Sequence, residues 1–222
     1  MINIALDGPS GAGKSTIARA VARSFGFTYI DTGAMFRSLG LKAVRLGIDI
    51  KSEPERIEAM LSGTTLDISR DGDEQHMILD GEDVTGLIRT PEVSKAASDI
   101  AVIPSVRTWL LSAERSIASR YDCIMDGRDI GTSVLPDADV KIFLTASPEA
   151  RAQRRYLELS EKGIDTNFDE VLAEMKYRDK QDASREVSPL AMADDAILAD
   201  TTELNLSESI ELVSGIIRKA MN

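Results

Sequence analysis

The 222-residue chain contains one cysteine, Cys123, and one histidine, His76. A single cysteine cannot form an internal disulfide, so the sequence gives no sign of an oxidising compartment. A single histidine cannot build a histidine-rich metal centre, and it argues against a Ser-His-Asp hydrolase.

The sequence also lacks a long apolar run and an excess of positive charge. No apolar stretch approaches the roughly 20 residues of a membrane span, and the opening MINIALDGPSG lacks the basic and apolar regions of a secretory signal. Lys and Arg number 26 against 37 Asp and Glu, a net charge of −11, which argues against broad nucleic-acid contact and a polybasic membrane anchor. We expect a soluble, cytoplasmic protein that handles small anions.

Short apolar runs separated by helix-length segments predict an α/β protein. The first run, residues 2–6, is followed by glycines and then by a helical pattern that ends at Gly26. Apolar runs without alternation are typical of parallel strands covered on both faces, so we expect a three-layer fold around about five such strands. The four further runs are residues 27–30, 123–125, 140–144 and 196–199.

Between residues 63 and 89 the pattern changes. Polar and apolar residues alternate there, with Asp71-Gly72 and Asp80-Gly81 as turn signals. This alternation predicts a small antiparallel meander inserted into the α/β unit. Capping residues predict three helix starts elsewhere, at Thr90, Ser147 and Asn167.

A glycine-rich motif lies between the first predicted strand and helix. Residues 8–16, GPSGAGKST, satisfy G-x-x-x-x-G-K-[ST], in which glycines let N–H groups point at phosphate oxygens beside a helix N-terminus. Lys14 would reach the β- and γ-phosphates of a nucleoside triphosphate, and the Ser15 hydroxyl would ligate Mg²⁺. The predicted nucleotide-binding residues are Gly8, Pro9, Ser10, Gly11, Ala12, Gly13, Lys14, Ser15 and Thr16.

The segment after residues 123–125 favours phosphoryl transfer over hydrolysis. Gly127 stands where hydrolytic P-loop proteins often carry a Glu that activates water, and no Asn-Lys-x-Asp guanine motif is present. Asp126 could steer Mg²⁺ through water or orient Arg128. Because guanidinium groups hold phosphates bidentately, arginines beside the strand-end loops predict a second phosphate site. Arg37 and Arg128 lie beside such loops, and Arg178 and Arg185, which flank Asp179 and Asp182, are the other candidates.

Six stretches of the chain share the order and spacing of one family. They are ALDGPSGAGKST (5–16), YIDTGAMFR (29–37), IRTPEV with AASDIAVIPSVR (88–93 and 96–107), MDGRDIGT (125–132), PDADVKIFLTASPEARAQRR (136–155) and RDKQDASREVSPL (178–190). Together they resemble the bacterial cytidylate kinases, a branch of the nucleoside monophosphate kinases. The DGRD segment and the insert are more specific than the P-loop, which shikimate and gluconate kinases share.

The resemblance implies a single cytidylate kinase domain over residues 1–222 with a P-loop NTPase-type fold. Its expected parts are a core (1–30 and 115–222), an NMP-binding region (31–114) with the β insert (64–88), and a short helical lid (148–166). The implied reaction transfers the γ-phosphoryl group of ATP to CMP or dCMP in pyrimidine nucleotide metabolism, with Mg²⁺ as cofactor. The implied protein is a cytoplasmic monomer without nucleic-acid or membrane partners.

The resemblance also implies roles for single residues. The expected acceptor-phosphate residues are Arg37 and Arg128, with Asp31, Thr32 and Phe36 in the adjoining segment, where many relatives carry Tyr in place of Phe36. The expected base contacts are Arg107, Asp129 and Arg185, and the expected sugar contacts are Ser98, Arg178 and Asp182. The expected catalytic residues are Lys14, Arg128, Arg154 and Arg155, of which the last two share a predicted lid face with Arg151.

Two other interpretations remain open on the sequence. One is a P-loop kinase that acts on UMP or on a non-nucleotide acceptor. The other is a nucleotide-dependent switch, which would hydrolyse slowly without an acceptor. A switch needs no second anion site, so the placement of the arginines counts against it.

Overall fold

The computed structural model describes residues 1–71, 74–185 and 187–221. The chain forms two compact units, one of Ile2–Tyr29 with Cys123–Asn222, and the other of Ile30–Asp122 with Met1. Within the described ranges, no helix has both the length and the apolar character needed to cross a membrane.

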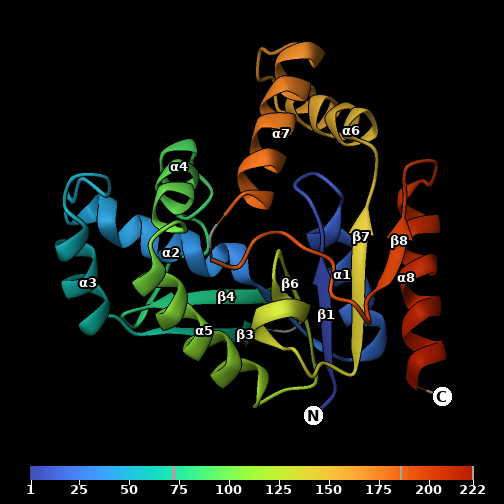
Figure 1. The fold of residues 1–222 in the computed structure, drawn as a ribbon, viewed down its shortest axis with the longest axis horizontal. Helices are drawn as coiled ribbons and strands as arrows, with labels where there is room; N and C mark the ends of the chain where they lie inside the picture. The colour runs from blue at the N-terminus through green and yellow to red at the C-terminus, as the bar shows by residue number, and fades with distance from the viewer. Residues whose placement is uncertain (72–73, 186, 222) are drawn as a thin grey trace. The chain divides into compact units, whose positions relative to one another are not determined.

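A five-stranded sheet holds the first unit together (Figure 1). The strand order is β2-β6-β1-β7-β8, and the β1–β6, β1–β7 and β7–β8 pairs are parallel. The strands are β1 (Asn3–Asp7), β2 (Thr28–Asp31), β6 (Cys123–Gly127), β7 (Val140–Thr145) and β8 (Ile197–Asp200). The five strands predicted from the apolar runs are therefore confirmed.

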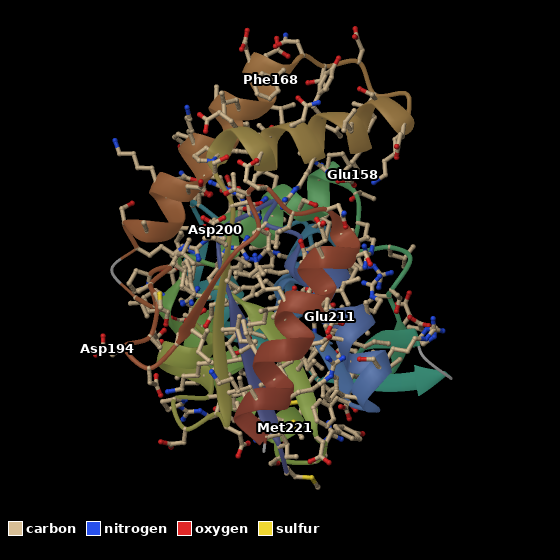
Figure 2. The ribbon with its side chains drawn as sticks, turned by 90° about the vertical axis from the view of Figure 1, so that its right-hand side faces the viewer. Glu158, Phe168, Asp194, Asp200, Glu211 and Met221 are labelled. Atoms are coloured by element: carbon tan, nitrogen blue, oxygen red, sulfur yellow. The ribbon has the colours of Figure 1, made fainter. Side chains whose placement is uncertain are left out.

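Two helices pack against this sheet and against each other. They are α1 (Lys14–Phe25) and α8 (Leu206–Met221), and Figure 2 shows α8 running alongside the sheet. Helix α1 ends at Gly26, whose φ of 71° gives the predicted left-handed stop. The shared core contains Ile4, Leu6, Ile17, Val21, Ile124, Ile142, Leu144, Val213 and Ile217. This packing fixes the strands whose carboxyl ends carry the site.

Helices α6 (Pro148–Glu161) and α7 (Phe168–Ala183) lie beyond the end toward which β1 and β7 point (Figure 1). Both predicted helix starts are confirmed. The Ser147 hydroxyl accepts a hydrogen bond from the Ala150 N–H at 3.1 Å, and the Asn167 side chain accepts one from the Glu170 N–H at 2.9 Å. The two helices pack on each other through Ala152, Val171 and Met175.

The second unit combines helices with a small antiparallel sheet, as the alternating segment predicts. The strands β3 (Leu66–Asp71), β4 (Glu74–Leu79) and β5 (Glu82–Asp83) pair in that order. Asp80 and Gly81, with φ of 52° and 86°, form the predicted turn between β4 and β5. The other predicted turn includes Gly72, which lies outside the described residues.

Helices of the second unit follow proline and cap signals only in part. They are α2 (Thr32–Arg45), α3 (Pro54–Ser62), α4 (Pro91–Ile100) and α5 (Pro104–Ala118). The Thr90 hydroxyl accepts a hydrogen bond from the Val93 N–H at 3.2 Å, which confirms the predicted start of α4. Helix α3 and a π-helix at Ile130–Val134, in the first unit, were not predicted.

Candidate active site

The glycine-rich loop joins the end of β1 to the start of α1 through three residues in conformations that favour glycine. Gly8, Gly11 and Gly13 have φ of 149°, 76° and 88°. A Cβ atom on Gly8 would lie 1.9 Å from the carbonyl oxygen of Leu144, and one on Gly11 would lie 2.2 Å from the Met175 side chain. The loop can therefore wrap closely only because these positions are glycine.

Lys14 is buried at the first position of α1, where its side chain folds back over the loop. Its ammonium group donates a hydrogen bond to the Pro9 carbonyl oxygen at 2.8 Å. Burial, together with the like charges of Arg128 and Arg178, holds the pKa of Lys14 well below its ordinary value. The carboxylates of Asp126 and Asp7 act in the opposite direction but do not outweigh these effects.

Three oxygen-bearing side chains meet between α1, β2 and β6. The Ser15 hydroxyl donates to one oxygen of Asp126 at 2.7 Å, and the Tyr29 hydroxyl donates to the other at 3.2 Å. Among the residues that the structure describes, no group of three or more His, Cys, Asp or Glu could hold a metal ion. A hydroxyl beside one carboxylate nevertheless fits Mg²⁺, which takes few protein ligands and keeps waters and phosphates.

Three arginines surround one buried carboxylate, and we call Asp182 with Arg128, Arg178 and Arg185 the arginine cluster. Arg128 donates to Asp182 from Nε at 2.9 Å, and Arg185 also donates to Asp182. Burial opposes ionisation, but the charges of the three arginines outweigh it and lower the pKa of Asp182. Crowding by protein atoms and the like charge of Arg128 lower the pKa of Arg178, although this residue keeps an exposed surface.

The three arginines of α6 share a helix face by spacing but have different partners. Arg151 is buried and donates to the Ser10 carbonyl oxygen at 2.9 Å and to both oxygens of Asp179 at 2.7 and 3.1 Å. Arg154 donates to the hydroxyl and carbonyl oxygens of Thr201. Arg155 is exposed and pairs with Glu158 at 2.8 Å.

In the second unit, Asp31 both caps α2 and holds Arg37. Its carboxylate accepts from the Ala34 N–H at 2.8 Å and from Arg37 Nη2 at 2.9 Å. Among the described residues, Arg37 Nε is buried without a hydrogen-bond partner. A Cβ atom on Gly33 would lie 3.0 Å from Arg37 Nη1, so Gly33 leaves room for this side chain.

The remaining predicted substrate residues of this unit lie on α2, α4 and α5. Arg107 is buried, stacks over the Phe36 ring at 5.6 Å and donates to the Ala101 carbonyl oxygen at 3.2 Å. The Ser98 hydroxyl donates to the Ser94 carbonyl oxygen at 3.1 Å, and Thr32 is buried at the start of α2.

Asp7 is a residue for which the sequence analysis found no role. It is the last residue of β1, is 4% exposed, and accepts hydrogen bonds from the N–H groups of Ile130 and Gly131 at 2.8 and 2.7 Å. Burial raises the pKa of Asp7 to about 6 in spite of these two donors. An acid at a strand end directly before a glycine-rich loop was the available signal.

A parallel sheet, a glycine-rich loop ahead of a helix and a buried lysine define a P-loop phosphate-binding protein. The chain matches the cytidylate kinase family over residues 4–219. The chain belongs to the cytidylate kinase family, and the resemblance predicted from its motifs is confirmed.

Two relatives are similar over nearly their whole length. The cytidylate kinase of Caldicellulosiruptor saccharolyticus is 49% identical over 221 residues, which cover 99% of this chain and 97% of the relative. The cytidylate kinase of Caldanaerobacter subterraneus subsp. tengcongensis is 50% identical over 218 residues, which cover 98% and 95%. A crystal structure of an uncharacterized protein from Eubacterium ventriosum matches with a TM-score of 0.54 and 13% identity, covering 98% of both chains, and shows the fold alone.

Proposed function

We propose that this member of the cytidylate kinase family transfers the γ-phosphoryl group of ATP to CMP or dCMP, giving ADP and the nucleoside diphosphate. The observation that carries the proposal is that a buried P-loop lysine and the arginine cluster lie near each other. Phosphoryl transfer brings several negative phosphates together, so a protein that catalyses it needs cations on both sides of the transferred group.

On the donor side, Lys14 and the N–H groups of residues 8–16 hold the β- and γ-phosphates of ATP. The buried ammonium of Lys14 is already directed over the loop by Pro9, so binding requires little reorganisation. Ser15 and Asp126 would hold Mg²⁺, which would supply positive charge that neutralises the charge developing on the phosphates. The Ser15–Asp126 hydrogen bond supports a metal role for Asp126 over a role in orienting Arg128, whose guanidinium donates to Asp182.

On the acceptor side, Arg37 and Arg128 hold the phosphate of the monophosphate. Each guanidinium is fixed by a carboxylate, Asp31 for Arg37 and Asp182 for Arg128, at the same N–O distance of 2.9 Å. Such a pair restrains the side chain and leaves other N–H donors for an anion. Thr32 and Phe36 belong to the same acceptor segment.

The base and sugar contacts follow from the chemistry of cytidine. Cytosine offers an amine donor beside two acceptors, which suits a carboxylate and arginines, here Asp129 with Arg107 and Arg185. Ser98, Arg178 and Asp182 contact the sugar. In this structure Asp182 accepts from Arg128 and Arg185, so one carboxylate links the phosphate, base and sugar contacts.

The lid part of the proposal concerns Arg154 and Arg155 on α6. Their guanidinium groups neutralise the transferred phosphoryl group when the lid closes, and closure excludes water as a competing acceptor. Arg151 anchors this helix to the P-loop through the Ser10 carbonyl oxygen. We further propose that the protein acts as a cytoplasmic monomer. Size-exclusion chromatography with light scattering tests whether it is monomeric.

An ADP-release assay with CMP, dCMP, UMP, AMP, GMP and shikimate as acceptors tests the reaction. We expect turnover with CMP and dCMP to exceed that with every other acceptor. Absence of turnover with both cytidine nucleotides would contradict the proposal. Faster turnover with UMP or shikimate would indicate a different P-loop kinase. Slow hydrolysis that no acceptor accelerates would indicate a nucleotide-dependent switch.

A further inference from the structure

The π-helix after β6 begins at two N–H groups that have an unusual partner. Its own hydrogen bonds run from Val134 N–H to the Asp129 carbonyl oxygen at 3.1 Å and from Leu135 N–H to the Ile130 carbonyl oxygen at 2.7 Å. The N–H groups of Ile130 and Gly131, at the start of the helix, instead donate to the two oxygens of Asp7. One side chain from β1 therefore caps this helix, 123 residues away in sequence.

This cap connects the proposed donor part of the site to the proposed acceptor part. Asp7 is followed directly by Gly8 of the P-loop, and Ile130 is preceded directly by Arg128 and Asp129. Strands β1 and β6 are neighbours, with Asp7 opposite Gly127. The two hydrogen bonds thus join the donor loop to the segment that carries two proposed acceptor residues. Short π-helical turns are often found at functional sites.

We propose that Asp7 is a positioning residue, which sets Arg128 and Asp129 against the P-loop by capping the π-helix with both carboxylate oxygens. The proposal rests on the proposed function, because it concerns how the acceptor is held. Asp7 itself touches the backbone of the segment and acts through it.

The chemistry of the cap requires a carboxylate. Two N–H donors face two different oxygens, and a carboxylate has an acceptor on each side. Asparagine has the same shape but offers one oxygen and one NH₂ group, so one N–H of the π-helix would meet another donor. Space is also limited, because a Cβ atom on Gly131 would lie 3.4 Å from an Asp7 oxygen and 3.2 Å from the Lys141 side chain.

The test compares the full-length wild-type enzyme with Asp7→Asn in two measurements. Amide hydrogen exchange of peptides that cover residues 128–135 needs no substrate and reports the cap directly. Steady-state kinetics with CMP and ATP varied separately report positioning. We expect exchange of this segment to be at least tenfold faster in the variant. We also expect the KM for CMP to rise at least tenfold while the KM for ATP changes less than threefold.

Asp83→Asn is the matched control. Asp83 also accepts a hydrogen bond from a backbone N–H at a strand end, from Thr85 at 2.9 Å, but it is exposed on the β insert. We expect this variant to keep wild-type exchange in residues 128–135 and wild-type KM values. Gly131→Ala, which crowds the same cap and keeps the carboxylate, is the second test variant and replaces Asp7→Asn if that protein does not fold.

Unchanged exchange in residues 128–135 would overturn the proposal, as would equal rises in the KM for CMP and for ATP, or a fall in kcat alone. An identical effect of Asp83→Asn would also overturn it. A wild-type enzyme without activity on CMP would overturn the proposed function instead, and the exchange result would still decide whether Asp7 caps the helix.

Discussion

The guanidinium–carboxylate pairs of the arginine cluster and of the β insert differ in burial and in charge balance. In the arginine cluster, the Asp182 side chain is 3% exposed and faces three arginines. Glu82 of the β insert and Arg45 at the end of α2 are 51% and 41% exposed and pair one to one. Water screens the exposed pair, whereas in the arginine cluster the shared carboxylate is buried and three positive charges face one negative charge.

The comparison also explains how a chain of net charge −11 can bind a polyanion. The overall charge describes mainly exposed carboxylates, and it argues against a nucleic-acid-binding surface. The proposed phosphate-binding cations lie instead at the carboxyl ends of β1 and β6, where Lys14 is buried and Arg128 is largely so. Local burial, and not the sum of charges, locates the site.

The first prediction concerns the buried lysine of the P-loop, Lys14. Because Lys14 meets like charges and lacks hydration, we expect Lys14→Ala to lower kcat about 10²–10³-fold, while the free energy of unfolding changes by about 1 kcal/mol or less. The ADP-release assay and urea denaturation measure the two effects. Lys95→Ala, at an exposed lysine of α4, is the control. Wild-type kcat in Lys14→Ala would contradict a role in phosphate binding.

The second prediction concerns Asp182, the buried carboxylate of the arginine cluster. Asp182→Asn leaves Arg128 and Arg185 without their counter-charge, so we expect the free energy of unfolding to fall by about 3 kcal/mol. CMP, whose phosphate Arg128 is proposed to hold, should restore part of this loss. Urea denaturation with and without CMP checks both statements. Asp67→Asn, at the exposed pair with Arg120, is the matched control, and an equal loss there would show that burial is not the cause.

The third prediction compares how the contributions of a buried and an exposed carboxylate to stability depend on pH. The pKa of Asp7 is raised to about 6, so the folded protein binds this proton more tightly than the unfolded chain does. The stability of the wild type relative to Asp7→Asn should therefore fall, by up to about 3 kcal/mol, as the pH rises from 4 to 6. Asp129 and Lys14 are the charged groups that act on Asp7.

The contribution of Asp83 to stability should change with pH in the opposite direction in the same experiment. Hydrogen bonds from Thr85 and His76 lower the pKa of Asp83 to about 2. The stabilising contribution of the Asp83 carboxylate should be present above pH 4 and be lost as the pH falls toward 2. Urea denaturation at several pH values, with each variant compared to the wild type, measures both trends. A stability difference for Asp7→Asn that does not vary between pH 4 and 6 would contradict the raised pKa.

Local signals were enough to predict the elements that frame the site. The five strands follow from uninterrupted apolar runs, and Thr90, Ser147 and Asn167 cap their helices as predicted because each cap depends on residues three positions apart. The P-loop is equally local, since its glycine conformations and its lysine lie within nine residues.

Contacts between distant segments could not be predicted in this way. The spacing of Arg151, Arg154 and Arg155 gives a shared helix face, but it does not say that Arg151 donates to Ser10, 141 residues away. The Asp7 cap depends on the register of β1 beside β6, and no periodicity of either segment contains that information. The roles given to the substrate residues stay predictions, because they rest on the family resemblance.

The smallest loss of stability is expected for the exposed pair of Glu82 and Arg45. Glu82 holds Arg45 at 2.6 and 2.9 Å, a geometry as close as that of Arg128 with Asp182. If distance decided the strength of a pair, Glu82→Gln would cost as much as Asp182→Asn. We expect a loss of only about 0.5 kcal/mol in urea denaturation, because water screens the exposed pair and ordering two long side chains costs entropy. Raising the salt from about 0.1 M to 1 M shortens the Debye length from about 10 to 3 Å, so it should abolish the small loss and leave most of the loss in Asp182→Asn. Equal salt dependence in the two variants would show that the arginine cluster is as open to solvent as the β insert.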